Sequence, residues 1–129
     1  MDNTQLPKVL VVDDEVKMCF TLRKLLELSH FQVEVAHDGL QAMDKVKSFQ
    51  PQCVLLDIRM PNSNGYEVLQ EIKDTSPDTV VIMTTAVASD DSRDQCMQAG
   101  AYDYLTKPVN FQTLLEKIEG SLKITLKKA

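Results

Sequence analysis

The chain is poor in cysteine, and its cysteines form no pattern typical of a disulfide framework or a zinc site. The three are odd in number, widely separated and outside any Cys-x-x-Cys motif. Disulfide-rich secreted domains and structural zinc sites depend on closely and regularly spaced cysteines. We therefore interpret Cys19, Cys53 and Cys96 as reduced thiols that pack in the interior. The two histidines, His30 and His37, show no metal-ligand spacing either.

An excess of basic charge and long apolar runs are also missing. The chain has 14 Lys and Arg against 19 Asp and Glu, which gives a net charge of −5. This balance argues against direct binding to nucleic acid or to an anionic membrane, and favours attraction of a cation. No apolar run approaches the roughly 18 residues of a membrane span, and the first residues lack the basic and apolar regions of a signal peptide. We expect a cytoplasmic location.

What the chain does contain is a regular alternation of strand-like and helix-like segments, without repeats, low-complexity tracts or internal linkers. Its 129 residues predict one domain over 1–129, with a core over about 7–123. Strands are predicted over residues 8–14, 31–36, 53–57, 79–85 and 101–106. Helices are predicted over residues 16–29, 38–50, 64–73, 89–99 and 111–122. This alternation predicts an α/β fold with an open, doubly wound parallel sheet.

Apolar residues at helical spacing predict the helix faces that pack on this sheet. In the first helix the predicted apolar face consists of Met18, Phe20, Leu22, Leu25 and Leu26. In the second helix, which Asp38 and Gln41 begin as a capping box, it consists of Leu40, Met43 and Val46. The segment 89–99 has little apolar surface, so we predict that it is the least firmly packed helix.

Polar residues follow four of the five predicted strands. Asp57 ends a buried apolar strand, where an ionised side chain has no structural use unless it is paired, metal-bound or catalytic. The other strand ends carry Asp13 and Asp14, Thr85 and Lys107. Ligand sites of open parallel sheets lie beyond the carboxyl ends of the strands, so we expect these side chains to meet at one rim.

The chemistry of this set favours a divalent cation and phosphoryl transfer. Two carboxylates about 4 Å apart repel by about 4 kcal/mol at an effective dielectric constant of about 20, so three acids would hold protons or a cation. Oxygen ligands without His or Cys favour Mg²⁺. Lys107 and the Thr85 hydroxyl would then bind an anion with several oxygens, and Asp57 could be the nucleophile that forms an aspartyl phosphate.

Over essentially its whole length the sequence resembles the CheY-like receiver domain of two-component response regulators. The matching segments are 11–15 (Val-Val-Asp-Asp-Glu), 55–61 (Leu-Leu-Asp-Ile-Arg-Met-Pro) with Gly65, Thr85-Ala86, and 104–108 (Tyr-Leu-Thr-Lys-Pro). Together, in order and at matching strand ends, they are a specific signal. The resemblance implies a flavodoxin-like (βα)₅ fold with strand order 2-1-3-4-5.

The resemblance also implies a role for each residue of the rim. Asp57 would accept a phosphoryl group from a sensor histidine kinase or a histidine phosphotransfer protein. Mg²⁺ would be held by Asp14, Asp57 and the main-chain carbonyl of Arg59, with Asp13 acting mainly through water. Thr85 and Lys107 would bind the phosphoryl oxygens.

Three further features are implied by the family alone. The peptide bond between Lys107 and Pro108 would be cis. Tyr104 would be the switch aromatic that responds to movement of Thr85 and changes the face made by the fourth helix, fifth strand and fifth helix. That face could also form a homodimer.

Other function classes fit the sequence less well. An aspartate-nucleophile phosphatase would place two acids two residues apart after one strand, whereas Asp13 and Asp14 are adjacent. A flavin site would need a Ser-, Thr- or Gly-rich phosphate loop after the first strand. The alternative that remains is a receiver-like scaffold that binds partners without phosphate. We expect a phosphoacceptor that assists its own phosphorylation and dephosphorylation, not an enzyme proper, and its output domain or effector stays open.

The two positions that flank the approach of hydrolytic water in the family carry Arg59 and Val87 here. Neither side chain is an obvious general base. We therefore predict that the phosphoaspartate hydrolyses slowly in the purified protein, as measured by intact mass over time. Loss of the phosphate within seconds would contradict this prediction.

Overall fold

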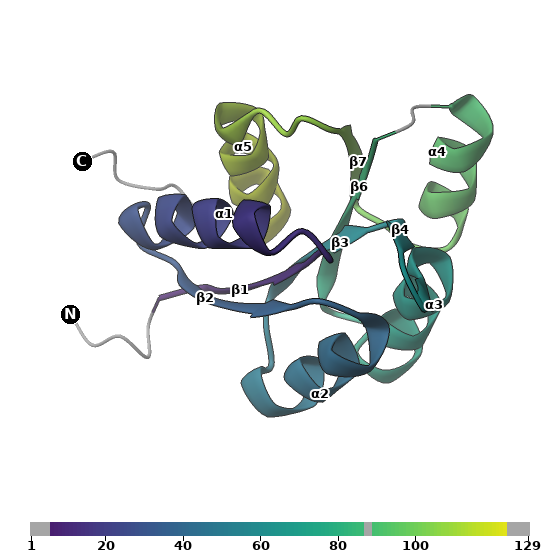
Figure 1. The fold of residues 1–129 in the computed structure, drawn as a ribbon, viewed down its shortest axis with the longest axis horizontal. Coiled ribbons are helices and arrows are strands. Elements are labelled where there is room, and N and C mark those ends of the chain that lie inside the picture. The colour runs from purple at the N-terminus through teal and green to yellow at the C-terminus, as the bar shows by residue number, and fades with distance from the viewer. Residues whose placement is uncertain (1–5, 87–88, 124–129) are drawn as a thin grey trace.

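The centre of the molecule is a five-stranded parallel sheet, seen in a computed structural model that describes residues 6–86 and 89–123 (Figure 1). Its strands are β1 (Lys8–Val12), β2 (Gln32–Ala36), β3 (Cys53–Asp57), β6 (Val80–Thr85) and β7 (Asp103–Thr106). The strand order is β2-β1-β3-β6-β7, and all four pairings are parallel. Numbered along the chain within this sheet, the order is 2-1-3-4-5, which confirms the predicted flavodoxin-like arrangement.

The position of each strand follows from its apolar content. Every residue of the central strand β3 is buried, and in β1 only Lys8 lies outside the buried set. Continuous apolar runs of this kind suit strands that helices cover on both faces. The alternating strand β2 and the short strand β7 lie at the two edges. Carboxylates at the ends of β1 and β3 are thereby held by the most buried part of the sheet.

Five helices cover the sheet in two layers (Figure 1). They are α1 (Val16–Leu28), α2 (Gly39–Phe49), α3 (Gly65–Thr75), α4 (Asp90–Gln98) and α5 (Phe111–Leu122). One apolar layer joins α1 and α5 to the sheet through residues such as Leu26 and Ile118. The other layer joins α2, α3 and α4 through Val46, Ile72 and Cys96. Among the described residues, no helix is long and apolar enough to cross a membrane.

Side-chain caps begin four of the five helices, α1 being the exception. The Asp38 carboxylate accepts a hydrogen bond from Gln41 N at 2.8 Å, and the Gln41 side chain accepts one from His37 N at 2.9 Å. This confirms the predicted cap of α2, although the Gln41 amide reaches one residue further back than in the usual capping box. Asn64 caps α3 through Tyr66 N at 2.8 Å.

Three apolar residues predicted to be buried are exposed. Phe20 is 59% exposed, Leu25 36% and Leu40 77%. Successive helical residues are about 100° apart, so Phe20 and Leu40 lie more than about 100° from the centres of the buried faces of α1 and α2. Those faces contain Cys19, Leu22 and Leu26 in α1, and Ala42, Met43 and Val46 in α2. The Phe20 ring is covered by Lys24 Nζ, 4.8 Å from its centroid.

A short hairpin follows β3 that the sequence analysis did not predict. It pairs β4 (Arg59–Met60) with β5 (Ser63–Asn64) in antiparallel fashion. Two-residue strands are too short to show an alternating pattern. Pro61 followed by Asn62 at a φ of 63° supplies the residue types of a tight turn with a left-handed third position.

The predicted weak packing of the fourth helix is confirmed. Within α4 only Cys96 is buried, and Met97 remains 40% exposed. The Tyr66 hydroxyl of α3 and the Ser92 hydroxyl of α4 are hydrogen-bonded at 2.5 Å. With one buried apolar residue, α4 is held in part by this polar contact to α3.

Gly65 lies against the main chain that carries Asp57. A Cβ at this position would lie 2.5 Å from Asp57 O and 2.6 Å from Ile58 Cα, both backbone atoms that cannot rotate away. The Gly65 amide donates to Ile58 O at 2.8 Å. Glycine is therefore required here by close approach between the start of α3 and the end of β3.

We predict that Gly65→Ala lowers the free energy of unfolding by about 1–3 kcal/mol, because the added methyl group overpacks the backbone. Gly120→Ala is the matched control. Its Cβ would meet only Tyr102 Oη, at 3.4 Å, and in the exposed part of α5 it should raise stability by up to about 1 kcal/mol. Urea denaturation measures both, and similar effects of the two substitutions would contradict the close-approach interpretation.

Candidate functional site

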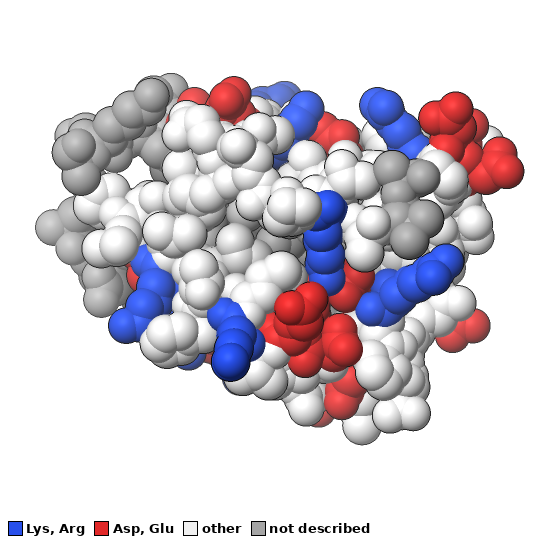
Figure 2. Space-filling model, turned by 45° about the horizontal axis from the view of Figure 1, so that its top comes forward, with Lys and Arg blue, Asp and Glu red and all other residues white. Residues whose placement is uncertain are grey.

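Three carboxylates meet at the carboxyl edge of the sheet. Asp13 and Asp14 follow β1, and Asp57 is the last residue of β3. One oxygen from each lies within 4.8 Å of the other two. Asp13 and Asp57 are buried, whereas Asp14 is exposed. In Figure 2, acidic side chains gather near the middle of this view, with lysine or arginine side chains beside them.

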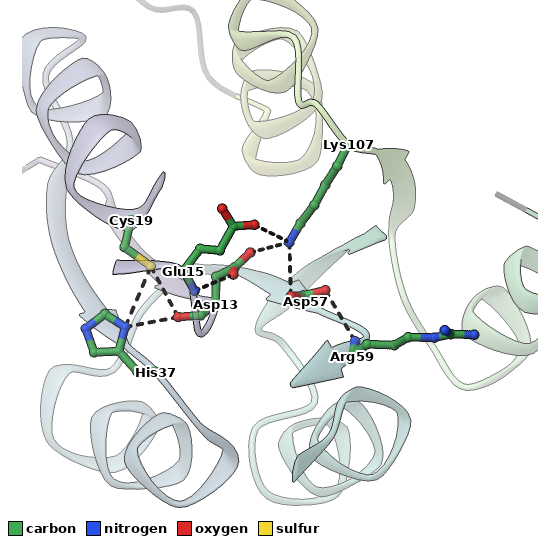
Figure 3. Close-up of polar contacts among 7 residues, drawn as sticks. All are labelled: Asp13, Glu15, Cys19, His37, Asp57, Arg59 and Lys107. Atoms are coloured by element: carbon green, nitrogen blue, oxygen red, sulfur yellow. Dashed lines mark hydrogen bonds and ion pairs between the residues drawn. The ribbon is translucent and has the colours of Figure 1, made fainter. Parts of the chain in front are cut away.

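Lys107 places an ammonium group between two of these carboxylates (Figure 3). Its Nζ donates a hydrogen bond to Asp57 Oδ2 at 3.0 Å and lies 2.8 Å from Asp13 Oδ2 as an ion pair. Glu15 Oε1 is 3.9 Å from the same nitrogen. The Lys107 amide donates to Thr85 O at 2.7 Å, and the Lys107–Pro108 peptide bond is cis. The end of β7 is thereby attached to the end of β6.

The Asp57 carboxylate is held in a largely dry environment with few donors. Its Oδ1 accepts a long hydrogen bond from Arg59 N at 3.3 Å, and the residue is 4% exposed. Burial raises the pKa of Asp57 above its usual value, and the charge of Asp13 adds to the rise. The Lys107 hydrogen bond opposes this without reversing it. Burial and the charge of Asp13 thus destabilise the Asp57 carboxylate relative to an exposed one, which favours its pairing with a cation.

The donor set fits a hard divalent cation. All three groups are carboxylates, and the buried Asp13 Oδ2 is paired with the same Lys107 ammonium that contacts Asp57. Among the described residues, the Lys107 ammonium pairs with Asp13 and Asp57 and lies 3.9 Å from Glu15, and Asp14 adds a fourth carboxylate, so negative charge is in excess at this point. Mg²⁺ takes one or two carboxylates together with water and phosphate oxygens, which suits this arrangement. Asp14, as the exposed member, is open to solvent on the side where a hydrated ion would enter.

The structure also places Thr85 and Tyr104, two further residues of the predicted site. Thr85 is buried at the end of β6 and lines a cavity of about 480 Å³ with Ile58 and Arg59. Tyr104 lies in β7, half-buried against the apolar layer that contains Cys96. The role of the Arg59 carbonyl as a ligand stays a prediction, and Val87 lies outside the described residues.

Two side chains that the sequence did not place near the cluster contact the main-chain oxygen of Asp13. His37 Nδ1 lies 3.0 Å from the main-chain oxygen of Asp13, and Cys19 Sγ lies 3.4 Å from the same atom. The His37 contact has no local signal, because His37 is 24 residues from Asp13 and meets it only through the pairing of β1 with β2. As expected, all three cysteines are free and buried.

The sequence model of the response regulator receiver domain matches residues 9–119. The chain belongs to this family. The response regulator MprA of Mycobacterium avium (strain 104) is 36% identical over 118 residues, which are 92% of this chain and 52% of that protein. The receiver domain thus spans about half the length of the curated relatives that it matches.

Solved receiver-domain structures share the fold. A CheY-like response regulator receiver domain protein from Methanospirillum hungatei JF-1 has a TM-score of 0.88 and 32% identity, over 92% of this chain and 95% of that one. A response regulator from Burkholderia pseudomallei, with a phosphorylated aspartic acid, a calcium ion and citrate, has a TM-score of 0.81 and 25% identity, over 91% of this chain and 72% of that one.

The raised pKa of Asp57 predicts a pH-dependent gain of stability in Asp57→Asn. Between the ordinary and the raised pKa the folded protein binds more protons than the unfolded chain, so stability falls as pH rises through this window. Asp57→Asn has no carboxylate at this position, so the variant should lack this decrease in stability with rising pH. We expect a higher urea midpoint than the wild type at pH 7, and a difference that shrinks as pH falls towards the ordinary pKa of about 3.9.

Asp74→Asn, at an exposed acid in α3, is the control and should leave the midpoint unchanged at both pH values. A midpoint for Asp57→Asn at pH 7 below that of the wild type would show that the Lys107 ion pair outweighs the burial of the Asp57 charge.

Proposed function

We propose that this receiver domain is a phosphoacceptor switch in which Asp57 takes a phosphoryl group from a phosphohistidine. The observation that carries this proposal is the surroundings of Asp57. A buried carboxylate with a raised pKa contacts the Lys107 ammonium and has two further carboxylates within 4.8 Å. A structural ion pair would need one acid and one base, whereas the acids outnumber the base in this cluster. A cation bound by these acids would supply the positive charge that an incoming anionic phosphoryl group needs.

In the proposed reaction an Asp57 oxygen attacks phosphorus. The O–P bond forms as the P–N bond to the donor histidine breaks, and the electron pair of that bond returns to the imidazole, which takes up a proton. Asp13, Asp14, Asp57 and the carbonyl of Arg59 would hold Mg²⁺, which when bound supplies positive charge to the phosphoryl oxygens. Lys107 would leave its ion pair with Asp57 and bind one of these oxygens, and the Thr85 hydroxyl would donate to another.

The response to phosphorylation would reach α4. Thr85 precedes the segment that leads into α4, and Tyr104 packs on the apolar layer that includes Cys96 of that helix. Movement of the Thr85 side chain towards the phosphoryl group would allow Tyr104 to turn inward and change the α4–β7–α5 face. The few buried residues of α4 support this, because switching segments come from the less stable parts of a fold.

Membership of the family supports a histidine kinase or phosphotransfer protein as the partner, and the phosphorylated aspartic acid of the Burkholderia relative supports Asp57 chemistry. We propose that residues 1–129 act as one receiver unit, with the core over about 7–123. Its output, a homodimer through α4–β7–α5 and a cytoplasmic location stay predictions.

We predict that acetyl phosphate and Mg²⁺ add one phosphate to the wild type, detected by intact mass. The adduct should be absent without Mg²⁺ and absent in Asp57→Asn, which has no nucleophilic carboxylate. Asp74→Asn, an exposed acid elsewhere, should be phosphorylated like the wild type. Lys107→Met should reduce the phosphorylation rate by about 10-fold or more, since an electrostatic donor to the transferring group is lost.

An unmodified wild type in the presence of Mg²⁺ and acetyl phosphate would instead favour the phosphate-independent scaffold. An adduct that persists in Asp57→Asn would place the acceptor elsewhere. Both results would overturn the assignment of Asp57.

A further inference from the structure

The main-chain carbonyl of Asp13 is contacted by two side chains from other parts of the fold (Figure 3). It lies at the end of β1, between the side chain of Cys19 in α1 and that of His37, which follows β2. His37 Nδ1 is 3.0 Å from the carbonyl oxygen and Cys19 Sγ is 3.4 Å from it. These contacts lie on the side of β1 away from Lys107.

The directions of these hydrogen bonds are decided by the acceptor. A carbonyl oxygen has no hydrogen to donate, so a hydrogen bond from His37 at 3.0 Å requires the tautomer with a hydrogen on Nδ1. The Cys19 thiol donates to the same oxygen, and its sulfur also lies 3.9 Å from His37 Nδ1. Burial raises the pKa of the Cys19 thiol to about 12, which keeps its hydrogen in place. A thiol is a weak donor. The imidazole is therefore the principal side-chain donor to this oxygen among the described residues.

The short turn that contains His37 is held by two hydrogen bonds of its main chain. The main-chain amide of His37 donates to Gln41 Oε1 at 2.9 Å, and Ala36 O, the preceding carbonyl, accepts from Asp13 N at 3.0 Å. The turn after β2 thus holds Asp13 twice, once at its amide and once at its carbonyl. A mobile surface histidine would not define the carbonyl direction in this way.

The Asp13 carbonyl belongs to the peptide group that joins Asp13 to Asp14. The orientation of this planar group decides how the two carboxylates diverge, with Asp13 buried towards Lys107 and Asp14 exposed. Without the imidazole donor, the peptide group could rotate so that the Asp13 carbonyl oxygen points in other directions. The separation of the oxygens of Asp13, Asp14 and Asp57 would then vary, and Mg²⁺ requires near-ideal octahedral geometry.

We propose that His37 is a positioning residue for the acidic cluster: its Nδ1–H holds the Asp13 carbonyl and so fixes the peptide group between Asp13 and Asp14. The proposal rests on the function proposed above, because it assigns His37 to the cation site that supports phosphorylation of Asp57. Partners of metal ligands commonly change affinity by about 10- to 100-fold when they are removed.

The test compares two variants that separate the ring from the donor. His37→Phe keeps a planar ring without a donor, and His37→Asn keeps an amide nitrogen near the position of Nδ1 without the ring. His37→Leu is a second variant without a donor, in case the larger Phe ring disturbs folding. His30→Asn is the control, because His30 is the other histidine, is exposed and has a φ of 73°, which asparagine tolerates.

Two readouts are taken on the full chain: Mg²⁺ binding by calorimetry with magnesium chloride alone, and the Mg²⁺ dependence of phosphorylation by acetyl phosphate. We expect His37→Phe and His37→Leu to bind Mg²⁺ about 10-fold more weakly. Their phosphorylation rate at saturating Mg²⁺ should stay within about two-fold of the wild type, since Asp57 and Lys107 are unchanged. His37→Asn should recover most of the affinity, and His30→Asn should match the wild type.

Wild-type Mg²⁺ affinity in both donorless variants would overturn the proposal. Equal loss in His37→Asn and His37→Phe would also overturn it, because the ring and not the donor would then matter. A wild type that binds Mg²⁺ but accepts no phosphate would refute the proposed function while leaving the calorimetric test of His37 intact. A wild type that binds no Mg²⁺ would overturn the role of His37.

Discussion

The ammonium group of Lys107 is the contact on which the arrangement of the rim depends. Asp13 and Asp57 are buried at the ends of adjacent strands, and two ionised carboxylates in such a place repel each other unless a cation lies between them. Lys107 reaches both from the end of β7. Its burial acts to lower its pKa, but its hydrogen bonds to the two carboxylates outweigh this and raise it. The lysine therefore stays charged and joins three strand ends.

The compensation is incomplete, and this is what makes the site chemically useful. The pKa of Asp57 is raised even though Lys107 contacts it, so one ammonium does not balance the surrounding acids. A protein selected only for stability would remove one of the carboxylates. The receiver domain instead retains excess negative charge around Asp57, which a bound divalent cation would neutralise. Under the proposed function, stability and activity are therefore opposed at Asp57.

The central strands of the sheet are far more deeply buried than helix α4. The strands β1, β3 and β6 carry Asp13, Asp57 and Thr85 on a backbone that is buried almost throughout. By contrast, α4 buries only Cys96 and contacts α3 through the hydroxyls of Tyr66 and Ser92. Site residues placed on the rigid part keep their geometry, while a neighbouring helix with little buried surface can respond at a small free-energy cost. The fold therefore suits a switch better than a rigid binding module.

The sequence by itself determined the element order, the parallel sheet and the residue types at its rim, because apolar periodicity and strand-ending acids are local properties. It was wrong about Phe20 and Leu40, which are apolar but lie outside the buried arcs of their helices, and it missed the hairpin of β4 and β5. The sequence predicted that Lys107 and Asp57, 50 residues apart, meet at one rim, but only the tertiary structure decided that Lys107 Nζ pairs with both Asp57 and Asp13 and that His37 meets the Asp13 carbonyl, 24 residues away. Such contacts depend on strand order and side-chain direction, which no local pattern specifies.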